Sequence, residues 1–195
     1  MEAEKQTDKQ LVEMTLKNPD CYEYIIQRYE SKLMRYIRRL TNVDQEAAED
    51  ILQEVFLKAY KNLHGYDDSF KFSSWIYRIT HNEVISYFRK TKSRPEIVDI
   101  QVDEDPNVDI LATLPSDINL RDDYIKKEMS EKVREVITAL PEKYRTVLVL
   151  RYMEDKSYDE IADILEKPAG TVATLISRAK DEFKKIAEKN HLNKE

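Results

Sequence analysis

Glycine and cysteine are scarce in this chain of 195 residues, which contains two glycines and a single cysteine, Cys21. One cysteine excludes an internal disulfide, and no His/Cys set has metal-ligand spacing, so we expect neither a metal site nor a cofactor. So few glycines, with six prolines and abundant Leu, Ile, Glu, Lys and Ala, argue against the turn-rich pattern of an all-β chain. The composition predicts an all-α fold.

Long apolar runs are also missing. No stretch of about 20 apolar residues occurs, and the first ten residues are charged rather than apolar, so neither a membrane span nor a signal peptide is expected. Together with the single cysteine, this predicts a soluble protein of the reducing cytoplasm. A glycine-rich phosphate loop, a nucleophile motif and a metal cluster are all absent from the sequence, which argues against an enzyme and predicts no catalytic residues.

Acidic residues outnumber basic ones, and the formal net charge is −6. Residues 1–90 hold 14 basic and 15 acidic side chains, a difference of −1, and residues 124–195 hold 15 and 14, a difference of +1. Residues 91–123 hold 3 and 9, a difference of −6. Because the whole deficit lies in this middle segment, the net charge does not exclude phosphate binding by the flanking parts.

The acidic middle segment also contains three prolines and only short apolar pieces, which is the composition of a linker that cannot bury a core. We therefore expect a helical domain at residues 8–92, a linker at 93–123 and a second helical domain at 124–190. A flexible linker of this length has an r.m.s. span of about 30 Å and an extended limit of about 110 Å. Two such domains could stand far apart on one ligand.

The first domain has apolar residues at helical spacing throughout. Capping side chains at residues 41–45 predict a helix that starts near Glu46, and Gly65 is a candidate left-handed C-cap residue for that helix. Residues 64–71 then form a loop, and a further helix is expected to end before Pro95.

The second domain contains a sharper pattern. Ser157 and Glu160 form a capping box ahead of a short helix at residues 158–165, and Pro168 suits the first turn of the next helix. Two short helices joined by three or four residues have the geometry of a DNA-binding helix-turn-helix. The alternative is an ordinary pair of amphipathic helices joined by a proline-containing turn.

Several segments resemble one family. Residues 140–147 (LPEKYRTV), 157–162 (SYDEIA) and 170–172 (GTV) resemble region 4 of the group-four, or extracytoplasmic-function (ECF), sigma factors of the sigma-70 family. Residues 50–60 (DILQEVFLKAY) resemble the polymerase-binding helix of sigma region 2, and residues 72–82 (FSSWIYRITHN) resemble its promoter-opening segment. The segments occur in the family's order and together span residues 11–186.

The resemblance implies a protein that binds core RNA polymerase and directs promoter-specific transcription initiation. Region 2 would open and read the −10 element, and region 4 would read the −35 element. The implied partners are promoter DNA, the coiled coil of the largest polymerase subunit and the flap of the second-largest subunit, and the existence of an anti-sigma factor stays open. The acidic linker resembles the family's segment that threads polymerase channels built to hold RNA, although a solubilising tether has the same composition.

The resemblance also assigns individual residues. It implies core-polymerase binding by Asp50, Gln53, Glu54 and Leu57, whose spacing places them on one helical face. It implies −10 DNA binding by Tyr66, Lys71, Arg78, Asn82, Arg89 and Lys90. It implies −35 DNA binding by Gly170, Thr171, Ala173, Thr174, Ser177, Arg178 and Lys180. Trp75 is expected in the core, because a lone tryptophan at an apolar helix position is usually buried.

The chain departs from the family in its second domain. Ala173 and Leu175 stand where basic residues are common, and Glu166-Lys167 replaces the usual glycine of the helix-to-helix turn. Weaker phosphate binding is expected. Leu175 either contacts thymine methyls or points at the protein. A helical adaptor and an autonomous helix-turn-helix regulator with weakened DNA binding remain alternatives.

Overall fold

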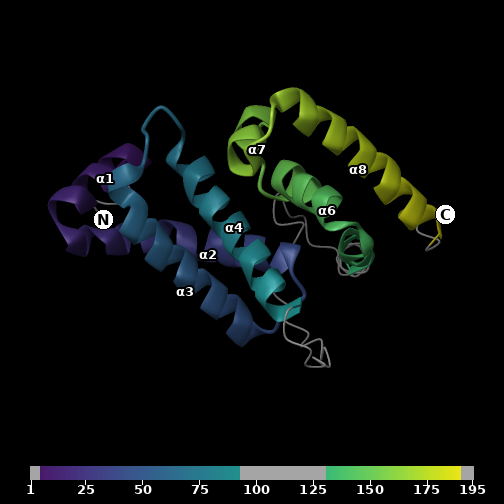
Figure 1. The fold of residues 1–195 in the computed structure, drawn as a ribbon, viewed down its shortest axis with the longest axis horizontal. Coiled ribbons are helices and arrows are strands. Elements are labelled where there is room, and N and C mark those ends of the chain that lie inside the picture. Colours follow the sequence, from purple (N-terminus) through teal and green to yellow (C-terminus); the bar gives the residue numbers. More distant parts are fainter. Residues whose placement is uncertain (1–4, 93–130, 190–195) are drawn as a thin grey trace, which may run out of the picture.

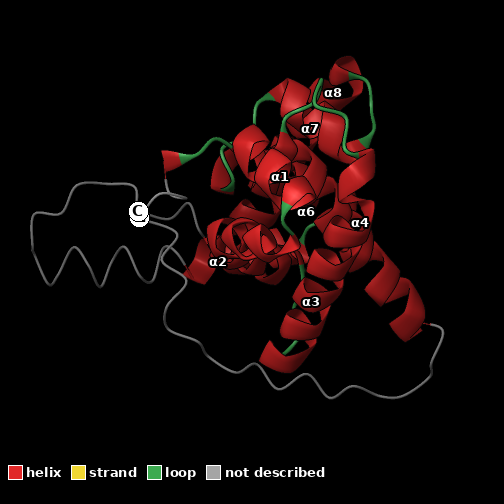
Figure 2. Cartoon of the chain, turned by 90° about the vertical axis from the view of Figure 1, so that its left-hand side faces the viewer, coloured by secondary structure: helices red, strands yellow, loops and turns green. Residues whose placement is uncertain are grey.

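The computed structural model describes residues 5–92 and 131–189, and within these two ranges it contains helices, short connections and no strand (Figures 1 and 2). The predicted all-α fold is therefore confirmed. The elements are, in chain order, α1 (Asp8–Lys17), a 3-10 turn (Pro19–Cys21), α2 (Tyr22–Leu40), α3 (Gln45–Asn62), a second 3-10 turn (Leu63–Gly65), α4 (Phe72–Lys92), α6 (Glu142–Leu148), a π-helical turn (Val149–Met153), α7 (Tyr158–Leu165) and α8 (Ala169–Lys189). Residues 131–139 are also helical. The predicted linker at 93–123 lies outside the described residues.

The ends of α3 show which local predictions hold. Asp44 caps the helix by accepting a hydrogen bond from the Ala47 amide at 2.8 Å, so the expected cap is confirmed and α3 begins within a residue of Glu46. The prediction for Gly65 is wrong, because no glycine has a positive φ among the described residues. The chain instead leaves α3 through a tighter 3-10 turn, in which the Tyr66 amide donates to the Leu63 carbonyl at 3.2 Å. No left-handed residue is needed there.

Helices α2, α3 and α4 build the core of the N-terminal half, and Figure 1 shows α3 and α4 side by side. The side chains of Leu33, Ile37, Val55 and Ile76 are fully buried. Trp75 is 8% exposed, so its predicted place in the core is confirmed. Its ring lies 5.3 Å from that of Phe72 and 5.4 Å from that of Tyr66, centroid to centroid.

The C-terminal half contains the predicted helix pair. Ser157 and Glu160 form the expected capping box, and α7 has the predicted bounds. Glu166 adopts the left-handed region at φ 51°, and the Lys167 amide donates to the Ala162 carbonyl at 3.0 Å. Glu166 therefore takes the backbone conformation that a glycine would adopt more easily, and the turn keeps its shape.

The two halves pack directly on one another. Helix α4 contacts α7 (Figure 1). The buried side chains of both halves form one continuous hydrophobic cluster. The length of the linker would allow the halves to separate, but the structure holds them together. None of the helices in residues 5–92 and 131–189 combines the length and apolar character that crossing a membrane requires.

Candidate functional site

The outer face of α3 carries the four residues expected to bind polymerase. Asp50, Gln53, Glu54 and Leu57 are all exposed, while the intervening apolar side chains point into the core. Leu57 is 50% exposed. Tyr60, one turn further on, is 43% exposed and was not selected from the sequence, although its i+3 spacing from Leu57 is visible there. The face therefore has an apolar end and an acidic end.

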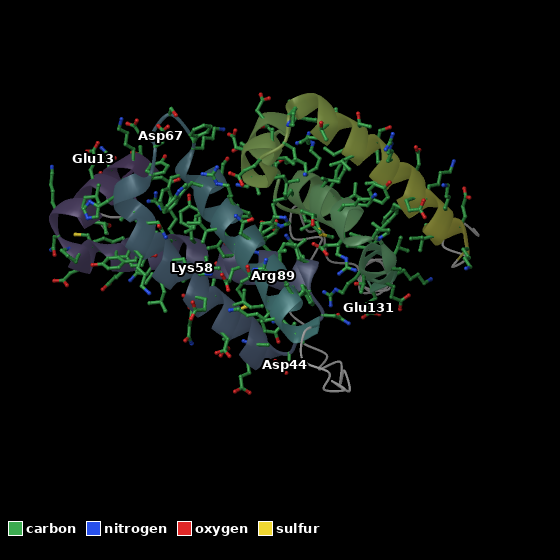
Figure 3. The ribbon with its side chains drawn as sticks, viewed as in Figure 1. Glu13, Asp44, Lys58, Asp67, Arg89 and Glu131 are labelled. Atoms are coloured by element: carbon green, nitrogen blue, oxygen red, sulfur yellow. The ribbon has the colours of Figure 1, made fainter. Side chains whose placement is uncertain are left out.

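The residues expected to bind −10 DNA follow α4 along its length. Lys71, Arg78, Asn82 and Arg89 recur at helical spacing on one side, and Figure 3 shows Arg89 and the loop residue Asp67 at opposite ends of the helix. We call these four residues the α4 stripe. Lys90 is exposed next to them. Arg78 is the most covered of the charged members, with 27% of its side chain exposed.

The loop that precedes α4 is held by its own hydrogen bonds. The Tyr66 hydroxyl donates to the Phe70 carbonyl at 2.5 Å, and the Ser69 amide donates to Asp67 Oδ1 at 2.9 Å. The second bond lowers the pKa of Asp67, and burial raises the pKa of Tyr66. The ring of Tyr66 is half-buried and packs against the core, with its centroid 5.3 Å from that of Phe72. Phe70 is 43% exposed and was missed, although an aromatic residue in a polar loop was the available signal.

The face of α8 expected to read −35 DNA is open. Gly170, Thr171, Ala173, Thr174, Ser177, Arg178 and Lys180 are all exposed. The ammonium of Lys180 lies 5.4 Å from the ring centroid of Tyr152, a 56% exposed tyrosine that sequence reasoning did not select. Hydrogen bonding to Tyr152 raises the pKa of Lys180, so this cation stays charged.

Leu175 lies on a different edge of α8. It is half-buried and lines a cavity of about 460 Å³ together with His81 of α4 and Leu165 of α7. Of the two alternatives for Leu175, the structure therefore supports the protein-facing one. The apolar side chain fits an edge that packs on protein, whereas an arginine there would have to leave the cavity.

Two residues of the α4 stripe have acidic partners in the C-terminal half. Lys71 Nζ lies 3.2 Å from Glu160 Oε1, and Arg78 Nη1 lies 3.5 Å from Glu166 Oε1. Burial by itself would raise the pKa of Glu160, but hydrogen bonds from Ser157 and Lys71 hold it below its usual value. The described residues contain no group of three or more His, Cys, Asp or Glu side chains placed to hold a metal ion.

Comparison with protein families gives two matches. Residues 25–94 match Sigma-70 region 2, and residues 130–182 match Sigma-70 region 4. The chain is 36% identical over 180 residues to the ECF RNA polymerase sigma factor SigW of Bacillus subtilis, covering 91% of this chain and 94% of that one. It is 31% identical over 180 residues to the ECF RNA polymerase sigma-E factor of Escherichia coli K12, covering 92% and 93%.

Solved structures share the fold. CnrH in complex with the cytosolic domain of CnrY matches with a TM-score of 0.66 at 17% identity, covering 94% of this chain and 98% of that one. The sigma factor RpoE in complex with the anti-sigma factor NepR from Bartonella quintana matches with a TM-score of 0.65 at 18% identity, covering 86% and 96%. The chain belongs to the ECF sigma factors of the sigma-70 family, which direct transcription initiation from promoters and are not enzymes.

Proposed function

We propose that this sigma factor divides its task as the order of its domains suggests. Residues 8–92 bind core RNA polymerase and read the −10 element, residues 93–123 connect the domains, and residues 124–190 read the −35 element while contacting the flap of the second-largest polymerase subunit. The protein then acts in the cytoplasm, where polymerase and promoter DNA are found. Because CnrH and RpoE are solved in complexes with CnrY and NepR, we further propose that this chain accepts an anti-sigma factor.

The exposed face of α3 carries the core-binding part of the proposal. Leu57 and Tyr60 supply the apolar anchor that most protein interfaces place at their centre, and Asp50, Gln53 and Glu54 surround it with acidic and amide groups. A basic coiled coil of the largest polymerase subunit suits this combination. The charged side chains would set orientation and the rate of encounter, and the apolar anchor would supply most of the affinity.

The α4 stripe and its preceding loop support the −10 assignment. Lys71, Arg78, Arg89 and Lys90 place positive charge along one path, which suits the backbone of a single strand. Phe70 presents an exposed ring at the start of this path. An unpaired base can stack on such a ring, and strand opening requires bases to leave the duplex stack.

Gly170 supports the −35 assignment. A Cβ built at this position would meet no atom within 4 Å, and the residue has no positive φ, so the folded chain itself does not require a glycine. Gly170 is the second residue of α8, and a glycine leaves the most room for a phosphate of the DNA backbone at a helix N-terminus.

Binding to core polymerase tests the proposal. We expect the triple substitution Asp50→Ala, Gln53→Ala and Glu54→Ala to weaken binding to sigma-free core polymerase by roughly tenfold, since each exposed polar side chain around the anchor would contribute about 0.2–1 kcal/mol. Mapped transcript starts on genomic fragments should disappear in parallel.

The matched control is Glu23→Ala, Gln27→Ala and Glu30→Ala, which removes the same kinds of exposed side chain from α2. This control should bind core polymerase as the unchanged protein does. Equal binding by both triple variants would refute the α3 assignment. A chain that binds core polymerase but yields no discrete transcript starts would instead support the helical-adaptor alternative.

A further inference from the structure

A second cavity, next to α2, is lined by several positively charged side chains. It has a volume of about 560 Å³, and its walls come from α1, α2, the start of α4 and the turn before α7. Arg28, Lys32 and Arg35 line it at positions i, i+4 and i+7 of α2, so they share one face of that helix. Lys156 lines it from the turn before α7. The described lining includes no residue of the α4 stripe or of the exposed face of α8.

The two most enclosed carboxylates of this cavity already have partners. Both oxygens of Asp8 and both oxygens of Glu154 accept hydrogen bonds at 2.6 to 2.8 Å. The donors are Arg28 and the Tyr29 hydroxyl for Asp8, and Arg39 and the Tyr77 hydroxyl for Glu154. A third carboxylate of the lining, Asp155, is exposed to solvent, which screens its charge.

Three cations of the lining have no such partner. Lys32, Arg35 and Lys156 form no ion pair with any side chain in residues 5–92 and 131–189. The ammonium groups of Lys32 and Lys156 instead lie over aromatic rings, 5.4 Å from the ring centroid of Tyr29 and 4.3 Å from that of Tyr77. An ammonium has three N–H donors, so this contact leaves donors for a ligand.

The positive charges around the cavity repel one another. Burial lowers the pKa of Lys156, and the carboxylates of Glu160 and Glu154 oppose this effect. The charges of Lys32 and Lys71 lower the same pKa further. Lys71 has its own partner, because its ammonium lies 3.2 Å from Glu160 Oε1. An anion placed between Lys32 and Lys156 would offset the repulsion between them and favour the charged form of Lys156.

We infer that this cavity binds a small anion with two or more linked phosphates, and that Lys32, Arg35 and Lys156 bind it. Exposed ion pairs are individually weak, so an anion gains useful affinity only by contacting several cations at once. A chain of phosphates can do so because its oxygens are spread along its length, whereas a single phosphate is compact. The cavity volume lies within the range of about 300–1,000 Å³ that is usual for small-molecule sites.

A single nucleic-acid strand fits this cavity less well. Strand-binding sites are grooves that follow the backbone over several nucleotides, whereas four elements surround this cavity. The inference is independent of the residues assigned to polymerase and DNA. Because both halves of the chain contribute to the site, a bound anion should also stabilise the folded protein.

Calorimetric titration of the full chain with inorganic pyrophosphate tests the site. We expect saturable binding at one site, roughly tenfold tighter than the binding of orthophosphate, since pyrophosphate can contact more of the cations. The double variant Lys32→Gln and Arg35→Gln should bind pyrophosphate roughly tenfold more weakly. Both side chains are exposed, so the fold should be retained, which circular dichroism checks. Lys156→Gln should weaken binding from the other half of the chain.

The matched control is Lys17→Gln and Lys61→Gln. These exposed lysines of α1 and α3 lie outside the cavity lining, and their replacement changes the net charge by the same amount. The control should bind pyrophosphate as the unchanged protein does. Thermal melts with and without pyrophosphate give a second readout, in which the unchanged protein and the control gain stability and the cavity variants do not.

Titrations with inorganic triphosphate and with ATP identify the source of the phosphates. Tighter binding of ATP would show that the nucleoside is also contacted, and the ligand would then be a nucleotide. Equal binding would show that the phosphate chain alone is recognised. Either result supports the phosphate site.

Three results would overturn the inference. The first is the absence of saturable pyrophosphate binding at millimolar concentration. The second is an equal loss of binding in the cavity variant and the control, which would reduce the effect to net charge. The third comes from a pool of random single-stranded DNA. If Lys32→Gln and Arg35→Gln weaken binding of this pool while pyrophosphate does not compete with it, the cations serve a nucleic-acid strand instead.

Discussion

At the scale of single residues, His81 shows how the interface between the halves changes a side chain's chemistry. Burial lowers the pKa of His81 to about 4, and the positive charge of Lys167 acts in the same direction. Its Nδ1 atom is buried and has no hydrogen-bond partner among the residues that the structure describes. Glu142 and Lys143 also line the cavity around it. His81 is therefore neutral in the folded protein at physiological pH.

The buried His81 should make stability depend on pH. Its pKa is lower in the folded chain than in the unfolded chain, so the unfolded chain binds more protons below pH 6.5. Stability should fall as the pH drops from about 6.5 towards 4, by about 1.4 kcal/mol at a pH of about 5.5. Denaturant unfolding at pH 7.5 and 5.5, compared with His81→Gln, measures this. An equal loss of stability in His81→Gln would mean that groups other than His81 cause the pH dependence.

The upper end of this window separates His81 from the carboxylates. Glu160 has a lowered pKa, so its contribution is present above its ordinary value of about 4.5 and is lost only as the pH falls below that value. A decline that begins near pH 6.5 therefore points to His81. A decline confined to lower pH points to Glu160 and similar acids.

At the scale of elements, the faces of α8 differ in what their side chains contact. Val172, Ile176 and Ala179 are buried against the rest of the C-terminal half, and Leu175 lines the cavity towards α4. Ala173 lies on the exposed face. Ala173 and Leu175, the two non-basic positions singled out in the sequence, are therefore not equivalent, because of the two only Ala173 is exposed.

This difference predicts opposite responses to added charge. Ala173→Lys should leave stability nearly unchanged and add one phosphate contact, which steepens the salt dependence of duplex DNA binding by about one unit of slope. Leu175→Arg should lower stability, because it removes packed apolar surface. Anisotropy titrations at several salt concentrations and thermal melts measure the two effects. Gln27→Lys on α2 is the control. An equal change in its salt-dependence slope would show that the added contact does not depend on α8.

At the scale of the whole molecule, the two halves share one core. The buried cluster runs without interruption from residues of α2 to residues of α8, and the ion pair between Arg39 and Glu154 lies within the interface with side chains 12% and 5% exposed. Burial, followed by the charge of Glu154, raises the pKa of Tyr77 well above its usual value, so its hydroxyl remains a donor. The stability of the chain is thus coupled to the packing of its two halves on one another.

A double-mutant cycle tests that coupling. Glu154→Leu removes the carboxylate that accepts from Arg39 and Tyr77, leaves Arg39 only the Met153 carbonyl, and should destabilise the protein by about 3–5 kcal/mol. Arg39→Met should cost a similar amount, and the double variant should cost clearly less than the sum, with a coupling energy of about 1 kcal/mol or more. Denaturant titration measures the free energy of unfolding of each variant. Additive losses would show that the pair does not hold the halves together.

The sequence by itself determined what depends on residues a few positions apart. Helical periodicity placed α3 and grouped Asp50, Gln53, Glu54 and Leu57 on one face of it, and the Ser157–Glu160 capping box placed the start of α7. The burial of Trp75 followed from its position on an apolar stripe. Such features are local, because a helix is specified by spacings of three and four residues and by side chains at its own ends.

Only the tertiary structure decided which distant groups meet. The partners Lys71 and Glu160 are 89 residues apart in sequence, and Arg39 and Glu154 are 115 apart. Glu160 was expected only as a capping residue and Lys71 only as a −10 DNA contact, and the edge of α8 that Leu175 occupies could not be assigned from periodicity. The physical reason is that the type of a side chain does not specify its partner in space, because its environment depends on how the two halves pack.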